Sequence, residues 1–112
     1  TTLFRSASIL LYLVVPIGDT STTMHYGNHM DLNNVQELVE NLYGDMDRER
    51  GLPPTVAWLC EEVGELAQAV RKGSKEEQLH ELGDVLAWLA SLANQLDLSL
   101  DDAINRYVTN PP

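Results

Sequence analysis

Positive charge is scarce in this sequence. Its 112 residues include 7 lysines and arginines against 17 aspartates and glutamates, which gives a formal net charge of −10 at pH 7. Proteins that bind the nucleic-acid backbone present a basic surface, so this balance argues against nucleic-acid binding. It suits a cytoplasmic protein, or a protein that holds cations.

Cysteine is almost absent as well. Cys60 is the only one, so the chain cannot form an internal disulfide. Its neighbours Trp58, Leu59 and Val63 are large and apolar. They predict a packed thiol rather than a reactive one.

The chain also lacks an apolar run long enough to cross a membrane. The run ILLYLVVPI at residues 9–17 is about half the required length, and Pro16 interrupts it. It could be the core of a signal peptide. Two other interpretations are favoured for residues 1–29. The first is a leader of vector origin or a protein-specific extension, because patterned sequence starts right after His29-Met30. The second is an apolar arm that adds a strand or covers a partner surface. We expect no membrane association, and we divide the chain into this leader and a domain at 30–112.

From Asp31 onward the pattern predicts four helices, without strands, repeats or a glycine-rich phosphate loop. Apolar residues recur every three or four positions, which places them on one face of each helix. The first helix ends at Gly51-Leu52-Pro53-Pro54, the second runs to Gly73, and Ser74 and Ser99 match N-cap positions of the last two. The apolar faces are Leu32, Val35, Val39, Leu42 and Met46; then Val56, Leu59, Val63, Leu66 and Val70; then Leu79, Leu82, Leu86, Leu89, Ala93 and Leu96. The third helix is apolar on more than one side, so we expect an all-α bundle of about four helices completed by dimerisation.

Two pairs of carboxylates stand out within these helices. Glu62 and Glu65 are three positions apart on the second helix, and Glu81 and Asp84 have the same spacing on the third, so each pair shares a helix face. A short connection around Gly73 makes the two helices antiparallel neighbours and can bring the pairs together. Carboxylates that converge in this way are stable when a hard cation lies between them. Ligation by oxygen alone favours Mg²⁺, with Mn²⁺ as the alternative.

Two glycines accompany the carboxylates. Gly64 and Gly83 lie inside the predicted helices, where glycine costs about 1 kcal/mol relative to alanine. Each is adjacent to a member of a carboxylate pair. We therefore predict that close approach of another backbone requires them.

The segments WLCEEVGELAQAV and HELGDVLAWLASLANQL resemble the MazG family of nucleotide pyrophosphohydrolases, in the all-α NTP pyrophosphatase superfamily. The resemblance covers about residues 31–110 and includes the complete family pattern, EExxE followed by ExxD. It implies a compact helical bundle that forms a homodimer or homotetramer, and hydrolysis of nucleoside triphosphates to the monophosphate and pyrophosphate. Carried over by motif position, the Mg²⁺ ligands are Glu62, Glu65, Glu81 and Asp84, and Glu61 orients or deprotonates the attacking water.

Basic residues are candidates for contacts with the substrate. Arg71 and Lys72 lie where the two carboxylate helices join and could bind the triphosphate, although basic residues near a helix C-terminus also complement the helix dipole. Arg106 and Asn110 match family positions in the helix that approaches the phosphates. The family often continues with further basic residues, which this chain does not have after Asn110.

Three further side chains have a functional and a structural interpretation. Asn94 matches a family position near the nucleotide, and helix-surface polarity is the alternative. Trp58 could stack on the base, although large aromatic residues at apolar helix positions are more often core. His80 adjoins Glu81 and could tune it, but an exposed helical histidine is the commoner case.

Three hypotheses follow. The first is a Mg²⁺-dependent pyrophosphohydrolase that converts a (d)NTP to (d)NMP and pyrophosphate, to control nucleotide pools or remove aberrant nucleotides. The second is the related phosphoribosyl-ATP pyrophosphohydrolase. The third is a non-catalytic helical interaction module that keeps the metal site. The lack of basic residues after Asn110 is the main support for it.

Overall fold

The structure is a computed structural model that describes residues 29–112, and the expectations for residues 1–28 lie outside this range. Four helices follow one another: α2 (Leu32–Arg50), α3 (Leu52–Lys72), α4 (Lys75–Gln95) and α5 (Leu100–Thr109). The described residues contain no strand, so the predicted all-α class is confirmed. None of these helices combines the length and the hydrophobicity that a membrane crossing requires.

The helices begin and end where the sequence supplies the right residues. Ser74 and Ser99 accept hydrogen bonds from the backbone N–H groups of Glu77 (3.1 Å) and Asp102 (3.2 Å), which confirms both predicted N-caps. Gly51 alone separates α2 from α3, and its φ of 85° suits a residue without a side chain. Pro53 and Pro54 occupy the first turn of α3, where a missing N–H is tolerated.

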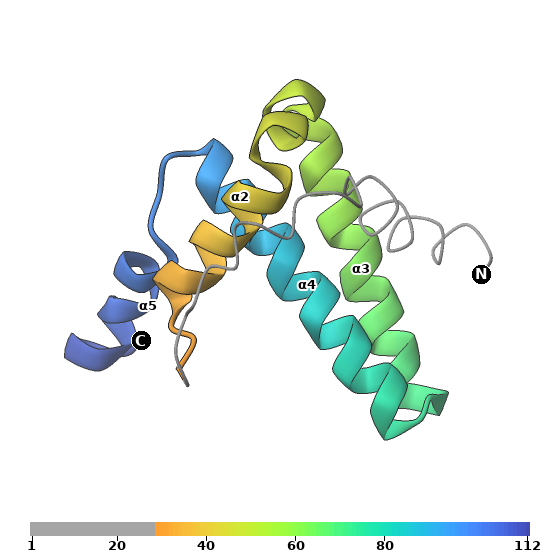
Figure 1. Ribbon diagram of the computed structural model, residues 1–112. Coiled ribbons are helices and arrows are strands. Elements are labelled where there is room, and N and C mark those ends of the chain that lie inside the picture. Colours follow the sequence, from red (N-terminus) through yellow and green to blue (C-terminus); the bar gives the residue numbers. More distant parts are fainter. Residues whose placement is uncertain (1–28) are drawn as a thin grey trace.

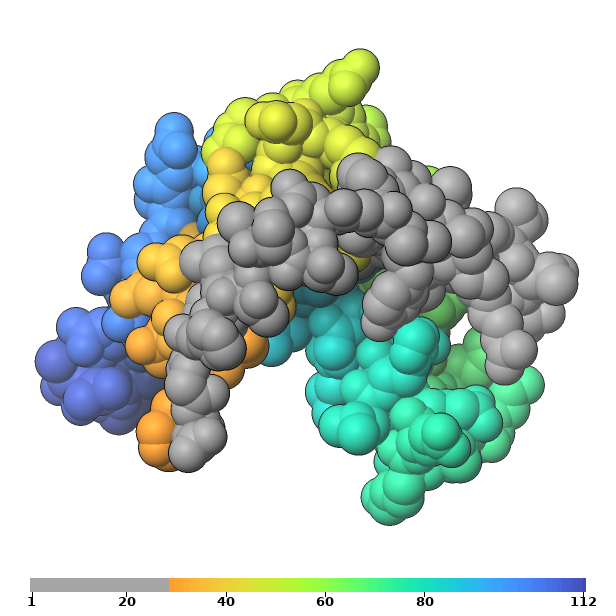
Figure 2. Space-filling model, viewed as in Figure 1, coloured from red at the N-terminus to blue at the C-terminus, as the bar shows by residue number. Residues whose placement is uncertain are grey.

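An antiparallel pair, α3 and α4, forms the longest part of the molecule, and α2 packs across the second half of α4 (Figure 1). In the space-filling view the turn between α3 and α4 projects away from α2 and α5 (Figure 2). The apolar core lies between α2 and α4 and is small. It consists of Val39, Tyr43 and Ala90, with Val35, Met46, Ala87 and Leu100 around them.

Gln36 fastens α2 to the connection between α4 and α5. Its side-chain amide donates to Asn94 Oδ1 (3.0 Å) and to the carbonyl of Leu98 (2.9 Å), and its Oε1 accepts from the N–H of Leu100 (2.8 Å). Asn94 returns a hydrogen bond to the carbonyl of Gln36 (2.9 Å). These bonds fix the place at which the chain leaves α4.

The buried side of α3 differs from the predicted one. Val56, Val63 and Val70 were expected to face the core, but each is at least 44 % exposed, while Thr55, Glu62, Glu65 and Ala69 are buried. On α4 the leucines at 79, 82, 86 and 89 are likewise exposed, as is Leu96 directly after the helix. The prediction of a packed Cys60 is also wrong, because the thiol lies on the exposed side of α3 with these valines. The periodicity identified the residues that share a face, but among the described residues most of that face stays exposed.

The prediction for the two glycines is wrong within a single chain. A Cβ atom built on Gly64 or on Gly83 would meet nothing within 4 Å among the described residues, so no backbone of the same domain approaches either position. Both glycines are exposed. In the isolated domain, the low helix propensity of glycine is then the only effect by which these two glycines change the stability relative to alanine.

We therefore expect Gly64→Ala and Gly83→Ala each to raise the free energy of unfolding by about 0.5–1 kcal/mol, because alanine restricts the unfolded chain and favours helix. Urea denaturation followed by circular dichroism measures the change. Gly44→Ala is the matched control: a Cβ there would lie 2.7 Å from atoms of the Glu40 side chain, so no comparable gain is expected. Loss of stability at Gly64 would show that something packs against it.

Candidate metal centre and active site

The contact between α3 and α4 is lined by carboxylates. Glu62 and Glu65 come from the middle of α3, and Glu81 and Asp84 come from the first half of α4, which runs in the opposite direction. Glu62 is completely buried, and Asp84 and Glu65 are 3 % and 9 % exposed. The structure thus brings the two predicted pairs into one seam.

The carboxylate oxygens lie close enough to share a cation. One ligand atom from each of Glu62, Glu65 and Glu81 lies within 4.8 Å of the others, and the same is true of His80, Glu81 and Asp84. Oxygens bound to one Mg²⁺ are about 3 Å apart when adjacent and about 4.2 Å apart when opposite, given bonds near 2.1 Å. A small contraction of either group would satisfy that geometry. Glu81 belongs to both groups and is the centre of the site.

A buried oxygen at this centre fits the same chemistry. Glu81 Oε2 is shielded from solvent and accepts no hydrogen bond from any described residue. A buried acceptor without a partner costs free energy, which a cation at this position would recover. Hard, oxygen-rich donor sets are the ones that Mg²⁺ and Mn²⁺ use. The residues therefore fit the expected metal, whose binding stays a prediction.

His80 is part of this arrangement. Its Nε2 lies 3.1 Å from Oδ2 of Asp84, one helical turn away on α4, and its side chain is about half exposed. Sequence reasoning treated His80 only as a residue that might tune Glu81. The signal was present in the i, i+4 spacing of His80 and Asp84, since that spacing places two side chains on one helix face.

Two tryptophans extend the seam by one helical turn. Trp58 lies four residues before Glu62, and Trp88 lies four residues after Asp84. Their rings stack with centroids 6.2 Å apart and planes 25° apart. Trp88 is buried, and the Arg50 guanidinium covers it at 4.7 Å from the ring centre. Trp58 is only half-buried, so the proposal that it contacts the base remains open.

A polar network that the sequence did not reveal braces the corner next to the tryptophans. Arg50 donates to Asp47 Oδ1 (2.9 Å), and Gln95 Nε2 donates to Thr55 Oγ1 (2.8 Å). Thr55 in turn donates to the carbonyl of Gly51 (2.8 Å). Asp47 and Thr55 are 2 % and 0 % exposed. Arg50 also donates to Thr55 Oγ1 (3.4 Å), so the network joins the end of α2, the start of α3 and the end of α4.

The other predicted site residues lie at the margins. Glu61 is half-buried and points about 100° around the helix from Glu62. Among the described residues, it belongs to neither group of converging ligand atoms. Arg71 and Lys72 occupy the exposed last turn of α3. Their roles stay predictions.

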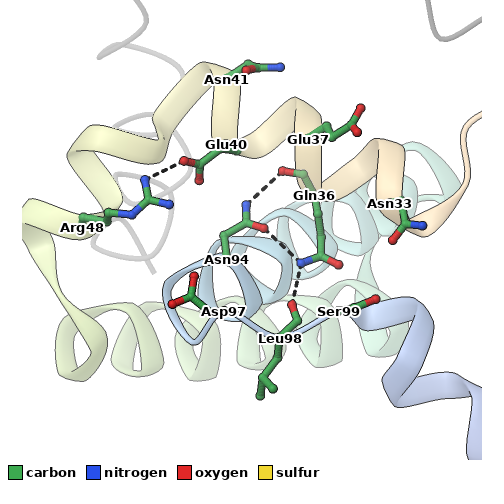
Figure 3. Close-up of a pocket in the computed structure, with 10 residues that line it drawn as sticks. All are labelled: Asn33, Gln36, Glu37, Glu40, Asn41, Arg48, Asn94, Asp97, Leu98 and Ser99. Carbon is green, nitrogen blue, oxygen red and sulfur yellow. Dashed lines mark hydrogen bonds and ion pairs between the residues drawn. The ribbon is translucent and has the colours of Figure 1, made fainter.

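Asn94 lies in a different place, in an open pocket of about 780 Å³ between α2 and the connection from α4 to α5 (Figure 3). It is ten positions beyond Asp84, or about 15 Å along α4. Carboxylates at Glu37, Glu40 and Asp97 line the pocket, and its arginine, Arg48, forms an ion pair with Glu40 at 2.6 Å. Hydrogen bonding to Glu40 raises the pKa of Arg48. This surface is ill suited to a triphosphate, and Asn94 there contacts Gln36.

Arg106 lies on α5, which packs against α2 and has no buried residue. Its guanidinium stacks at 5.0 Å on the ring of Tyr107 and donates to the Tyr107 hydroxyl at 3.1 Å. The carboxylate seam is on other helices. A phosphate contact by Arg106 stays a prediction.

Comparison with known proteins settles the family. The model of the MazG nucleotide pyrophosphohydrolase domain matches residues 52–109. The chain belongs to this family. The matched range begins at the start of α3 and includes the entire carboxylate seam of this MazG domain.

Two relatives each cover more than two thirds of this chain. The gene 37 protein of Mycobacterium phage L5 is 32 % identical over 92 residues, covering 70 % of this chain and 81 % of its own. Protein YpjD of Bacillus subtilis (strain 168) is 44 % identical over 88 residues, covering 69 % of this chain and 79 % of its own.

A metal-binding test follows from the buried oxygen of Glu81. We expect Mg²⁺ or Mn²⁺ to raise the melting temperature of the wild type, because a ligand that binds only the folded state stabilises it. Glu81→Gln removes one buried charge, so it should raise the metal-free melting temperature by a few degrees and abolish most of the metal-induced increase. Differential scanning fluorimetry measures both. Glu76→Gln, on the exposed first turn of α4, should change neither; an equal metal response in Glu81→Gln would contradict the site.

Proposed function

We propose that the protein is a divalent-metal-dependent nucleoside triphosphate pyrophosphohydrolase, which converts a (d)NTP and water to a (d)NMP and pyrophosphate. The observation that carries the proposal is the convergence of Glu62, Glu65, Glu81 and Asp84 in one seam of a MazG domain. We propose Mg²⁺, or Mn²⁺ in its place, as the physiological metal. The cytoplasm is the expected location, where the enzyme would limit nucleotide pools or remove aberrant nucleotides.

The four carboxylates act by holding positive charge at a fixed point. When bound, a divalent cation neutralises phosphate oxygens and makes a coordinated water more acidic. Glu62, Glu65 and Asp84 are buried and Glu81 is half-buried between the two helices, so we expect their positions to change little during the reaction. Glu61 lies at the edge of the seam and is assigned the attacking water, which it would orient by accepting a hydrogen bond or deprotonate as a base.

Substrate contacts are assigned to residues around this seam. Arg71 and Lys72, exposed at the end of α3, would contact the outer phosphates, together with Arg106 of α5. The half-buried Trp58 would contact the base beside the seam. For Asn94 we propose an indirect role within a single chain, because it binds Gln36 and lies far along α4 from Asp84.

Turnover is tested by incubating the metal-replete protein with a panel of nucleotides and measuring pyrophosphate. We expect pyrophosphate release from at least one (d)NTP. Glu65→Gln should lower kcat/KM by about 100-fold or more, because the amide cannot replace the charge of a buried ligand. Circular dichroism confirms that the variant is folded, and Glu76→Gln should retain wild-type activity.

The outcomes separate the hypotheses. Cleavage of phosphoribosyl-ATP alone would assign the protein to the histidine-pathway type of pyrophosphohydrolase. Absence of pyrophosphate from every nucleotide, in a folded sample whose melting temperature rises with metal, would identify a non-catalytic metal-binding module.

We further propose that two chains pair through the exposed apolar sides of α3 and α4, here called the outer face. It comprises Val56, Cys60, Val63 and Val70 of α3, Leu79, Leu82, Leu86 and Leu89 of α4, and Leu96 directly after α4. Because the helices are antiparallel, helical-wheel positions place both stripes on the side of the hairpin away from α2. The eight aliphatic members are each 38–72 % exposed, and large apolar surfaces of this kind mark interaction sites in proteins.

A second copy is the occupant that matches this face. Both stripes are uncharged and aliphatic, so the face complements itself about a two-fold axis and yields a four-helix bundle. The small core between α2 and α4 gives one chain little apolar burial of its own. Dimerisation would supply it.

Leu82→Glu should convert the assembly to monomers, because a charge in the centre of the outer face cannot be buried without a partner. Size-exclusion chromatography with light scattering measures the mass. Cys60 provides a second signal: its reaction with a thiol reagent should be slow in the wild type and fast in the variant. Val108→Glu, on the exposed α5, is the matched control and should leave the mass unchanged. A monomeric wild type at about 100 µM, well above the Kd of a stable dimer, would contradict the proposal.

A further inference from the structure

His80 stands at the rim of the carboxylate seam and joins it through Asp84. Nε2 of the imidazole lies 3.1 Å from Oδ2 of Asp84, and the imidazole side chain is 47 % exposed while that of Asp84 is 5 % exposed. Asp84 is therefore held in place by the helices, and His80 approaches it from solvent. The two residues are one turn apart on the same helix, so α4 alone sets their spacing.

The spacing equals that of two ligands on one metal ion. Adjacent ligands of an octahedral ion stand about 3.0–3.1 Å apart when their bonds are 2.1–2.2 Å long, as they are for imidazole nitrogen and carboxylate oxygen. Ligand atoms of His80, Glu81 and Asp84 all lie within 4.8 Å of one another. Glu81 also offers the buried Oε2, which no described residue satisfies. A nitrogen and at least two oxygens thus converge at the solvent end of the seam.

We infer that His80 Nε2 is a metal ligand at the Asp84 end of the site, and that it shifts the metal preference of this protein from Mg²⁺ towards Mn²⁺. Imidazole nitrogen suits transition-metal dications, whereas Mg²⁺ strongly prefers oxygen and retains its waters. A mixed nitrogen and oxygen set on an exposed rim therefore selects Mn²⁺ without excluding Mg²⁺. The inference uses the same carboxylates as the proposed function, but it does not require turnover.

The direct test is a spectroscopic signature of nitrogen bound to Mn²⁺. The full chain is loaded with Mn²⁺ at pH 8, and electron spin-echo envelope modulation is recorded. We expect ¹⁴N modulation in the wild type and its loss in His80→Gln, in which an uncharged polar side chain remains at this position. His29→Gln is the matched control, because it removes another exposed histidine and should retain the modulation.

Affinity provides the second readout. Loss of one ligand should weaken Mn²⁺ binding about tenfold or more. Mg²⁺ binding, measured by competition with Mn²⁺, should change by less than about threefold, because Mg²⁺ gains little from the imidazole. The His80→Gln variant should thus lack most of the preference for Mn²⁺ over Mg²⁺ that the wild type shows.

Each contrary result overturns the inference. Bound Mn²⁺ without ¹⁴N modulation, or equal losses of Mn²⁺ and Mg²⁺ affinity in His80→Gln, would show that His80 only positions Asp84. Failure of Mn²⁺ to bind the wild type would also exclude it. These results are distinguishable from failure of the proposed function, in which ¹⁴N modulation is present but no nucleotide releases pyrophosphate.

Discussion

The burial of carboxylates between α3 and α4 is the constraint on which the rest of this structure depends. An antiparallel helix pair is ordinarily joined by aliphatic side chains, yet here Glu62, Glu65 and Asp84 are at most 9 % exposed. Removing a carboxylate from water costs several kcal/mol unless hydrogen bonds or an opposite charge offset the loss. Nε2 of His80 lies 3.1 Å from Oδ2 of Asp84, but this oxygen accepts no hydrogen bond from any described residue. The seam therefore adds little to stability by itself, and other contacts have to hold the two helices at their separation.

Those contacts lie at the end of the seam and on the far side of α4. Stacking of Trp58 on Trp88 supplies apolar and aromatic contact one turn beyond the carboxylates. The Arg50 guanidinium covers Trp88 and neutralises the buried Asp47, so a cation and an anion enter the interior together. Gln36 then fixes α2 to the end of α4 through four hydrogen bonds that involve its side chain or carbonyl. Stability is thus concentrated near the α2–α3 corner, and the α3–α4 turn projects away from it (Figure 2).

The sequence predicted the helices well because their boundaries depend on local chemistry. The capping residues act within a few positions of the chain, so their effect can be predicted from the sequence alone. They are Ser74, Ser99 and the two prolines after Gly51. The spacing of the carboxylates was equally informative, since positions three apart share a helix face wherever the helix lies. A short turn between the two helices was then sufficient to place the two carboxylate pairs opposite each other.

The side of α3 that is buried could not be predicted in the same way. A valine stripe and a carboxylate stripe both repeat at helical intervals, and burial of the valines within the chain is the usual outcome. The opposite occurs here, because the carboxylates take the internal seam and the valines form the outer face with Cys60. The hydrogen bonds between Gln36 and Asn94 could not be predicted from the sequence either, since they join residues 58 positions apart. Sequence periodicity specifies neighbours along one helix, whereas these contacts depend on how separate helices meet.

The charge of the protein gives the buried seam a consequence for binding. A chain of net charge −10 repels a triphosphate at long range, and the four seam carboxylates, which are among its 17 acidic residues, concentrate that repulsion locally. A divalent cation at the seam would offset two of these negative charges and present a positive centre to the phosphate oxygens, so in the proposed reaction phosphate affinity and metal occupancy are coupled. Because three of the four carboxylates are buried, solvent screens them weakly, and this effect would be larger than on an exposed surface. In the proposed function, the burial that makes the metal-free seam costly also makes the site responsive to metal, and a bound cation is what allows so acidic a domain to act on polyanions.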